Sequence, residues 1–109
     1  MLKGLIGSAV AEKVLLFLAN YSEGYPREIA RTFDLNLSAV QGRLDRLERG
    51  GIVVSRLRGR TRLYVFNPRW AFREELLALL RRALAAIPPD EVRRFYRNRT
   101  RPRRRGKPL

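Results

Sequence analysis

The chain contains neither cysteine nor histidine. Without cysteine it has no disulfide and no thiolate ligand for a metal ion. Without histidine it lacks the commonest imidazole ligand and the usual general base of enzymes. The two absences argue against a metal sensor and against an enzyme, so we expect no cofactor and no catalytic residue.

Acidic residues are scarce. The chain has 10 Asp and Glu against 24 Lys and Arg, which gives a formal charge of +14. The positive electrostatic field of such a protein attracts polyanions. Nucleic acid is the first candidate and an anionic membrane surface is the second. Long apolar runs are missing too, since the longest, residues 14–19, is too short to span a bilayer. The sequence therefore predicts a cytoplasmic nucleic-acid-binding protein with no membrane partner.

A chain of 109 residues is long enough for one domain with a modest core. A first helix is predicted from about Ser8 to Asn20, because Ser8 is a good N-cap and apolar residues recur behind it at helical spacing. A loop follows from Asn20 to Tyr25, marked by small and polar residues. The apolar stripe of this first helix is expected in the core, and comprises Val10, Val14, Phe17, Leu18 and Tyr21.

Two short helices joined by a tight turn are predicted next. Pro26 suits the first position of a helix, and Ile29, Ala30 and Phe33 share one face. Asn36 is a good N-cap for the second helix, which the pair Gly50-Gly51 ends. Helices joined so closely must cross steeply, and this geometry is that of a helix-turn-helix.

A basic β-hairpin is predicted directly after the second helix. Residues 52–66 are rich in β-branched and aromatic residues, with a turn expected at Arg58-Gly59. Between Val53 and Phe66 the hairpin carries four arginines and no acid. A hairpin in this place is a wing. The fold class is therefore mainly α with a small β-hairpin, a winged helix-turn-helix with an added C-terminal helix.

The C-terminal part divides into three segments. A long helix is predicted from about Arg69 to Ala86, and Pro88-Pro89 ends it. A short accessory helix is expected within residues 88–97, beginning at Asp90-Glu91. Residues 98–109 are mostly Arg, Pro, Gly and Lys, and we expect a disordered basic tail that binds nucleic acid. Residues 1–87 would then form the winged domain.

The long helix has apolar residues over more than half of its circumference, which is more than one contact face requires. Either both sides pack within one chain, or one side packs on a second subunit. We favour the second interpretation, which predicts a homodimer. The residues expected in its interface are Phe72, Leu76, Leu80, Leu84 and Ile87.

The second helix of the pair is the candidate recognition helix, whose exposed residues would face base edges in the major groove. Gln41 could pair with adenine, and Arg43 with guanine or a phosphate. Gly42 costs on the order of 1 kcal/mol relative to alanine inside a helix. It marks either a close approach of the helix backbone to DNA or a surface glycine with no role. The candidate DNA-binding residues of the helix are Asn36, Ser38, Ala39, Gln41, Gly42, Arg43 and Arg46.

The wing would contact DNA separately. Arg58 and Arg60 flank Gly59 and can reach the adjacent minor groove or phosphates, while Arg56 and Arg62 lie nearer the body and would contact the backbone. Asp45 is expected to pair with Arg49 four residues on, or to face solvent.

Residues from about Gly7 to Ile87 resemble a winged-helix transcriptional regulator of the ArsR/MarR type. The motifs that carry the resemblance are Arg27-Glu-Ile-Ala30, Leu35, Ala39-Val40, Leu44, Leu47-Glu48, Gly51-Ile52, Ser55-Arg56, Gly59-Arg60, Tyr64 and Asn67. The resemblance implies a dimer, usually formed through the terminal helices, that binds a pseudopalindromic operator. Asp34 stands where the family often has glycine, and the ligands of metal-sensing members are missing.

The leading hypothesis is therefore a sequence-specific, double-stranded-DNA-binding transcriptional regulator that acts as a homodimeric repressor. One alternative is an architectural or RNA-associated protein that binds the nucleic-acid backbone with little sequence preference. Another is an adaptor whose apolar helix docks an unidentified protein partner, such as an enzyme.

Overall fold

The computed structural model describes residues 1–97. In this part of the chain, helices and one hairpin follow in the order α1 (Lys3–Ile6), α2 (Ala9–Tyr21), α3 (Pro26–Phe33), α4 (Leu37–Arg49), β1 (Val53–Arg58), β2 (Thr61–Phe66), α5 (Arg73–Ala85) and α6 (Pro89–Phe95). The predicted fold class, a mainly helical winged helix-turn-helix with an added C-terminal helix, is confirmed. The basic tail, residues 98–109, lies outside the described residues.

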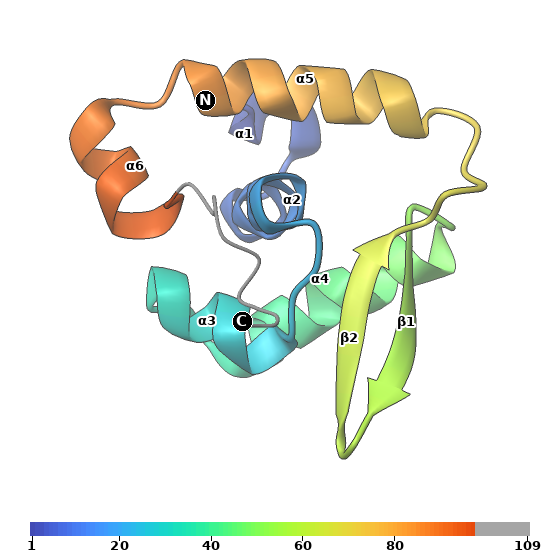
Figure 1. Cartoon of the computed structure of the whole chain (residues 1–109). Coiled ribbons are helices and arrows are strands. Elements are labelled where there is room, and N and C mark those ends of the chain that lie inside the picture. Colours follow the sequence, from blue (N-terminus) through green and yellow to red (C-terminus); the bar gives the residue numbers. More distant parts are fainter. Residues whose placement is uncertain (98–109) are drawn as a thin grey trace, which may run out of the picture.

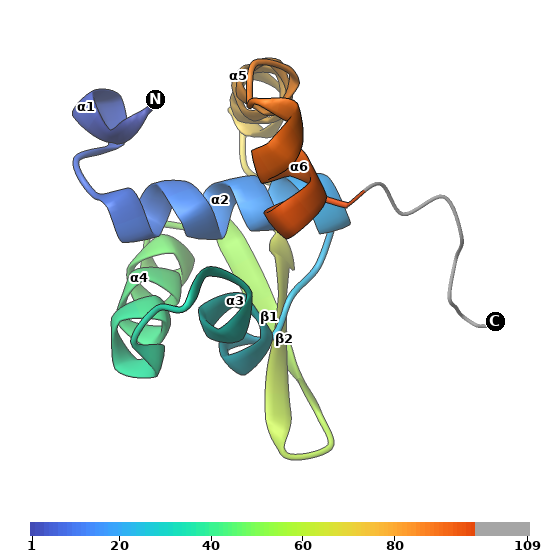
Figure 2. The same cartoon turned by 90° about the vertical axis from the view of Figure 1, so that its left-hand side faces the viewer.

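Helix α2 lies at the centre of the molecule. It packs against α3 and α4 on one side and against α5 on the other, while the β1–β2 hairpin projects away from the body (Figures 1 and 2). The core forms where these elements meet, and its most completely buried side chains come from all of them: Val14, Phe17, Leu18, Ile29, Val40, Leu44, Val53, Leu63 and Leu80.

Both expected N-caps are present. The Ser8 hydroxyl accepts a hydrogen bond from the Ala11 N–H at 3.1 Å, and the Asn36 side-chain oxygen accepts one from the Ala39 N–H at 3.2 Å. Between α3 and α4, Asp34 adopts a left-handed conformation with φ of 54°, so it serves the tight turn in place of glycine.

The hairpin is anchored to the body through Gly24. Its N–H donates to the Tyr64 carbonyl at 3.0 Å, and its carbonyl accepts from the Tyr64 N–H at 2.9 Å. A Cβ atom at position 24 would lie 2.7 Å from the Phe17 ring, so only glycine fits between this ring and β2. The two residues that turn the hairpin are Gly59 and Arg60, one position later than predicted.

The predicted start of the C-terminal helix is wrong by four residues. Asn67 folds the connection back on itself, because its side chain donates to the Gly51 carbonyl and accepts from the Arg69 N–H. The Trp70 N–H then donates to the Asn67 carbonyl, and the Arg73 N–H donates to the Trp70 carbonyl. These turn hydrogen bonds occupy backbone groups that would otherwise pair within a helix. Helix α5 therefore begins only at Arg73.

Two of the five residues expected in a dimer interface lie in the core of a single chain. Leu80 is fully buried and Ile87 is 7% exposed, because the side of α5 that carries Leu80 and leads on to Ile87 packs against α2. The expectation that one chain leaves them uncovered is wrong. Leu76 and Leu84 are partly buried against the same core, and Phe72 precedes the helix with 62% of its surface exposed.

The accessory helix forms as α6 and packs beside α3. The Phe33 ring lies 5.3 Å from the Phe95 ring and 5.6 Å from the Tyr96 ring, centre to centre. None of the helices within residues 1–97 is long and apolar enough to cross a membrane.

Candidate nucleic-acid interface

The interface is built around the exposed side of α4. Val40 and Leu44 are fully buried and hold this helix on the core, which leaves Ser38, Ala39, Gln41, Gly42 and Arg46 exposed. Arg43 is half-buried. The expected ion pair between Asp45 and Arg49 is present, with 3.0 Å between the charged atoms. It offsets an exposed acid in the middle of this surface.

At the N-terminus of α4 two candidate side chains bond to each other. The Ser38 hydroxyl donates to the Asn36 side-chain oxygen at 2.8 Å, and the same oxygen caps the helix. Asn36 and Ser38 therefore stabilise the start of the helix, and the Asn36 oxygen is not free to accept from a base.

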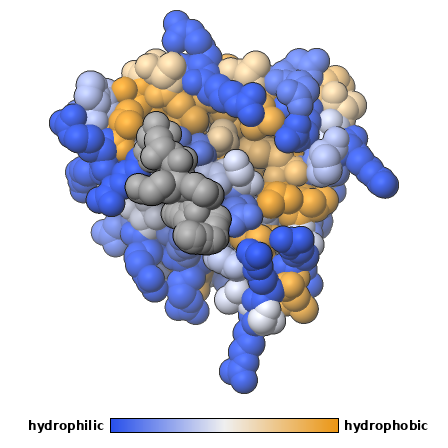
Figure 3. Space-filling view, in the orientation of Figure 1, coloured by the Kyte–Doolittle hydropathy of each residue, from blue (hydrophilic) through white to orange (hydrophobic). Residues whose placement is uncertain are grey.

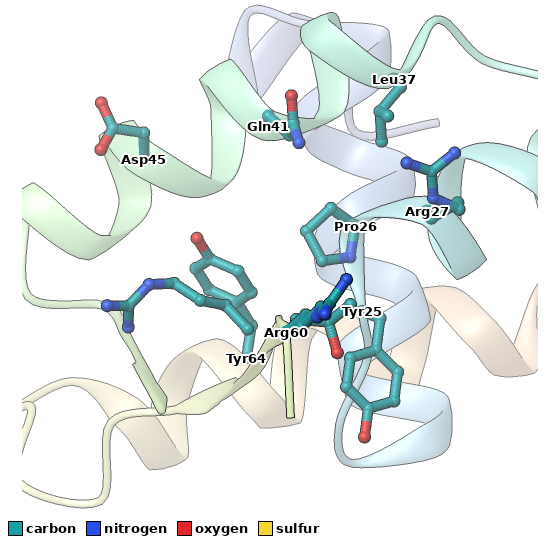
Figure 4. Close-up of a pocket in the computed structure, with 10 residues that line it drawn as sticks. Tyr25, Pro26, Arg27, Leu37, Gln41, Asp45, Arg60 and Tyr64 are labelled. Atoms are coloured by element: carbon teal, nitrogen blue, oxygen red, sulfur yellow. The ribbon is translucent and has the colours of Figure 1, made fainter. Parts of the chain in front are cut away.

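Gln41 and Arg43 lie on opposite flanks of α4. Gln41 faces the wing across a hollow of about 450 Å³ (Figure 4). Arg43 lies on the other flank, in a shallower hollow of about 400 Å³ that Val10 of α2 also lines. A helix inserted in a major groove could therefore reach base edges on one side through Gln41 and on the other side through Arg43.

The sequence did not predict that residues of α4, the wing and the start of α3 would line one hollow. Gln41 and Asp45 approach it from the helix, and Arg60 and Tyr64 approach it from the wing (Figure 4). Tyr25 and Arg27, at the start of α3, close one end. These two residues lie in a loop and a first helical turn. The packing of α3 on α4 and the β2–Gly24 pairing bring them here, and the second of these contacts has no sequence signal.

All four wing arginines are exposed, and the pairing of the strands sets their positions. Arg60 lies in the turn itself, at the end that projects farthest from the body (Figure 1). The lower edge of the molecule, which includes this tip, is mostly hydrophilic (Figure 3). Arg56 lies on β1 and pairs across the hairpin with buried Leu63.

Arg62 is tied to α4 by a short chain of hydrogen bonds. Its guanidinium donates to the Ser55 hydroxyl at 3.1 Å, and that hydroxyl donates to the Glu48 carboxylate at 2.8 Å. The neighbouring Tyr64 is buried, and this burial, followed by the nearby Glu48 charge, raises the pKa of its hydroxyl. Hydrogen bonds through Ser55 thus join the wing to the C-terminal part of α4.

Arg58 has a partner on the body. A hydrogen bond with the Tyr25 side chain, and to a smaller extent the Glu23 charge, raise the pKa of its guanidinium above the ordinary value. Arg58 is still exposed, but it is held near the start of α3, whereas Arg60 lies in the turn and lines the hollow between the wing and α4.

No family model and no curated protein matches the chain. Solved structures do share its fold. Reduced HlyU from Vibrio cholerae is 23% identical, with 75% of this chain and 83% of HlyU covered and a TM-score of 0.61. A mutant MarR from E. coli is 20% identical over 84% of this chain and 74% of MarR, with a TM-score of 0.60.

A transcriptional regulator of the MarR family from Rhodococcus sp. RHA1 is 26% identical over 84% of this chain and 71% of that protein, with a TM-score of 0.53. These similarities support the winged helix-turn-helix architecture seen in the elements themselves.

Proposed function

We propose that this protein is a sequence-specific DNA-binding transcriptional regulator. The observation that carries the proposal is the combination of α4, with its core-facing Val40 and Leu44, and an arginine-bearing wing joined to it through Glu48, Ser55 and Arg62. A helix and a hairpin arranged in this way suit the major groove and the adjacent backbone or minor groove. The structurally similar Rhodococcus protein is a transcriptional regulator, which supports the same function for this chain.

In this proposal base contacts come from the flanks of α4. Gln41 is exposed and pairs with adenine, and Arg43 pairs with guanine or a phosphate. Arg46 and Arg49 lie a turn or more further on and contact the backbone. The wing arginines neutralise phosphates, with Arg60 at the tip closest to the minor groove.

We further propose a homodimer that acts as a repressor. Exposed apolar side chains remain on α1 and around α5, and both helices lie on the side away from the wing tip (Figures 1 and 2). Leu5 is 72% exposed, Phe72 62% and Leu79 38%. A second copy would cover these side chains, and a two-fold dimer places two recognition helices on two half-sites.

Selection of bound sequences from a random DNA pool tests the function. We expect an inverted-repeat motif, and for Gln41→Ala or Arg43→Ala a loss of roughly 1–3 kcal/mol on the best site with relaxed preference at one position. Placing the selected site over a promoter should then lower transcription from it when the protein is present. Equal affinity for all duplexes would favour the architectural alternative, and a purely monomeric protein would favour a missing partner.

A further inference from the structure

Gly42 lies at the part of the recognition helix α4 that is farthest from the core. Val40 and Leu44, two residues to either side, are fully buried. Two residues turn an α-helix by about 200°. Gly42 is therefore directly opposite the buried side, on the crest that a groove would meet first.

The fold itself does not require glycine at this position. Apart from its chain neighbours and the adjacent backbone of its own helix, a Cβ atom built on Gly42 would have no atom within 4 Å, and the φ of Gly42 is not left-handed. Alanine would fit without strain, and it would stabilise the helix, because glycine is among the poorest helix formers. Gly42 therefore destabilises the helix, and packing within the described residues does not explain why glycine stands there.

The surroundings of Gly42 give the crest a distinct shape. The preceding turn adds only the small side chains of Ser38 and Ala39, both exposed. The long side chains of Gln41 and Arg43 lie on the two flanks, one toward the wing and the other toward α2. The N-terminal half of the helix is therefore low along its crest and has its longest side chains at its sides.

This shape matters in a major groove. An α-helix with its side chains is about 10–12 Å across, and the groove is about 12 Å wide and 8.5 Å deep. A helix that fills the groove so closely is limited in depth by whatever side chain lies on its crest. Its flanking side chains reach base edges only if the crest approaches the groove floor.

We propose that Gly42 sets the depth at which α4 enters the major groove, and so determines whether Gln41 and Arg43 reach the bases. The inference rests on the proposed function and assigns a specificity-determining role to a residue without a side chain. DNA bases approach the α4 backbone at Gly42, while Gln41 and Arg43 reach base edges on either side of the helix.

The test compares Gly42→Ala and Gly42→Leu with the wild type on two duplexes, the best site that the wild type selects and an unrelated sequence of equal length. Ala78→Leu, on the exposed side of α5, is the matched control. We expect Gly42→Ala to raise Tm by about 4–8 °C, since alanine favours the helix. The same variant should bind the selected site about 10-fold more weakly, and Gly42→Leu about 100-fold more weakly.

Affinity for the unrelated duplex should stay within about twofold, because phosphate contacts account for it. The Ala78→Leu control should bind both duplexes as the wild type does. If both Gly42 variants keep the wild-type affinity for the selected site, the inference is overturned and the proposed function stands. If the wild type itself shows no preferred sequence, both are overturned. Gly42→Ala keeps the comparison valid even where leucine disturbs the fold.

Discussion

The Tyr21 hydroxyl donates a hydrogen bond of 2.7 Å to the Phe95 carbonyl, across 74 positions of the chain. The same hydroxyl accepts a hydrogen bond of 3.0 Å from the Arg97 N–H. One phenol at the end of α2 therefore bonds to two backbone groups at the end of α6. Together with the ring contacts of Phe33, it holds the accessory helix against the helix-turn-helix.

Replacing Tyr21 with phenylalanine should loosen α6 without unfolding the domain. The ring remains in contact with Phe17, but both hydrogen bonds are lost. We expect a loss of about 1–2 kcal/mol in the free energy of unfolding, measured by urea denaturation. Amide hydrogen exchange should accelerate in α6 and stay unchanged in α4. Uniform acceleration along the chain would mean that α6 is not separately fastened.

This contact also shows where sequence-based prediction ends. The caps at Ser8 and Asn36 and the wing could be predicted, because each depends on residues within a few positions of one another. The Tyr21–Phe95 bond depends on how α6 folds back, and no local pattern encodes that path. The same holds for Gly24, whose small size matters only because Phe17 and β2 meet there.

The prediction of the C-terminal helix failed for a related reason. Apolar periodicity shows that a side is buried but not which chain buries it, so Leu80 and Ile87 looked available for a second subunit. Trp70 and Phe72 continued the apolar pattern backwards, but the turn that Asn67 nucleates keeps them out of the helix. In the site, Gln41 and Arg43 could be chosen for chemistry, whereas their separation onto opposite flanks emerges only in the structure.

Two wing arginines should differ in their contribution to DNA binding, although the sequence treats them alike. Arg60 lies in the turn and lines the hollow that faces α4, while Arg58 interacts with Tyr25 at the start of α3. Arg60→Ala should reduce the slope of log affinity against log salt by about 0.9, the value for one phosphate contact. Arg58→Ala should reduce it by less. Binding titrations between low and physiological salt give both slopes, and a larger change for Arg58→Ala would contradict the assignment.

Self-association should depend on the exposed apolar residues and not on those buried in the chain. Introducing a charge with Leu5→Glu, Phe72→Glu or Leu79→Glu should shift a dimer toward monomer by at least about tenfold in dissociation constant, since each side chain is exposed in one chain. Sedimentation equilibrium at micromolar concentration measures this shift.

Leu57→Glu is the matched control, because Leu57 is 64% exposed on the wing, away from α1 and α5. It should leave the dissociation constant unchanged. A wild-type protein that sediments as a monomer would remove the basis for the proposed dimer, and unaltered dimers in all three variants would place the interface elsewhere.

Alkaline pH should destabilise the fold through Tyr96, which is 4% exposed between α6 and α3. Burial, followed by the charge of Glu91, raises the pKa of its hydroxyl in the folded protein above the ordinary value of 10.0. Below that value neither state is ionised and the group has no effect. Above it the unfolded chain loses the proton and the folded chain keeps it, so the unfolded state binds fewer protons and stability falls as pH rises.

Tyr96→Phe removes this group. Between about pH 8 and pH 11 the wild type should lose at most about 1 kcal/mol more than the variant, once solvent screening is allowed for. Urea denaturation at the two pH values measures the difference, and Tyr25→Phe, the same chemical change at a half-buried site, is the control. Parallel losses in wild type and Tyr96→Phe would show that the Tyr96 hydroxyl ionises equally in both states, and that α6 does not shield it.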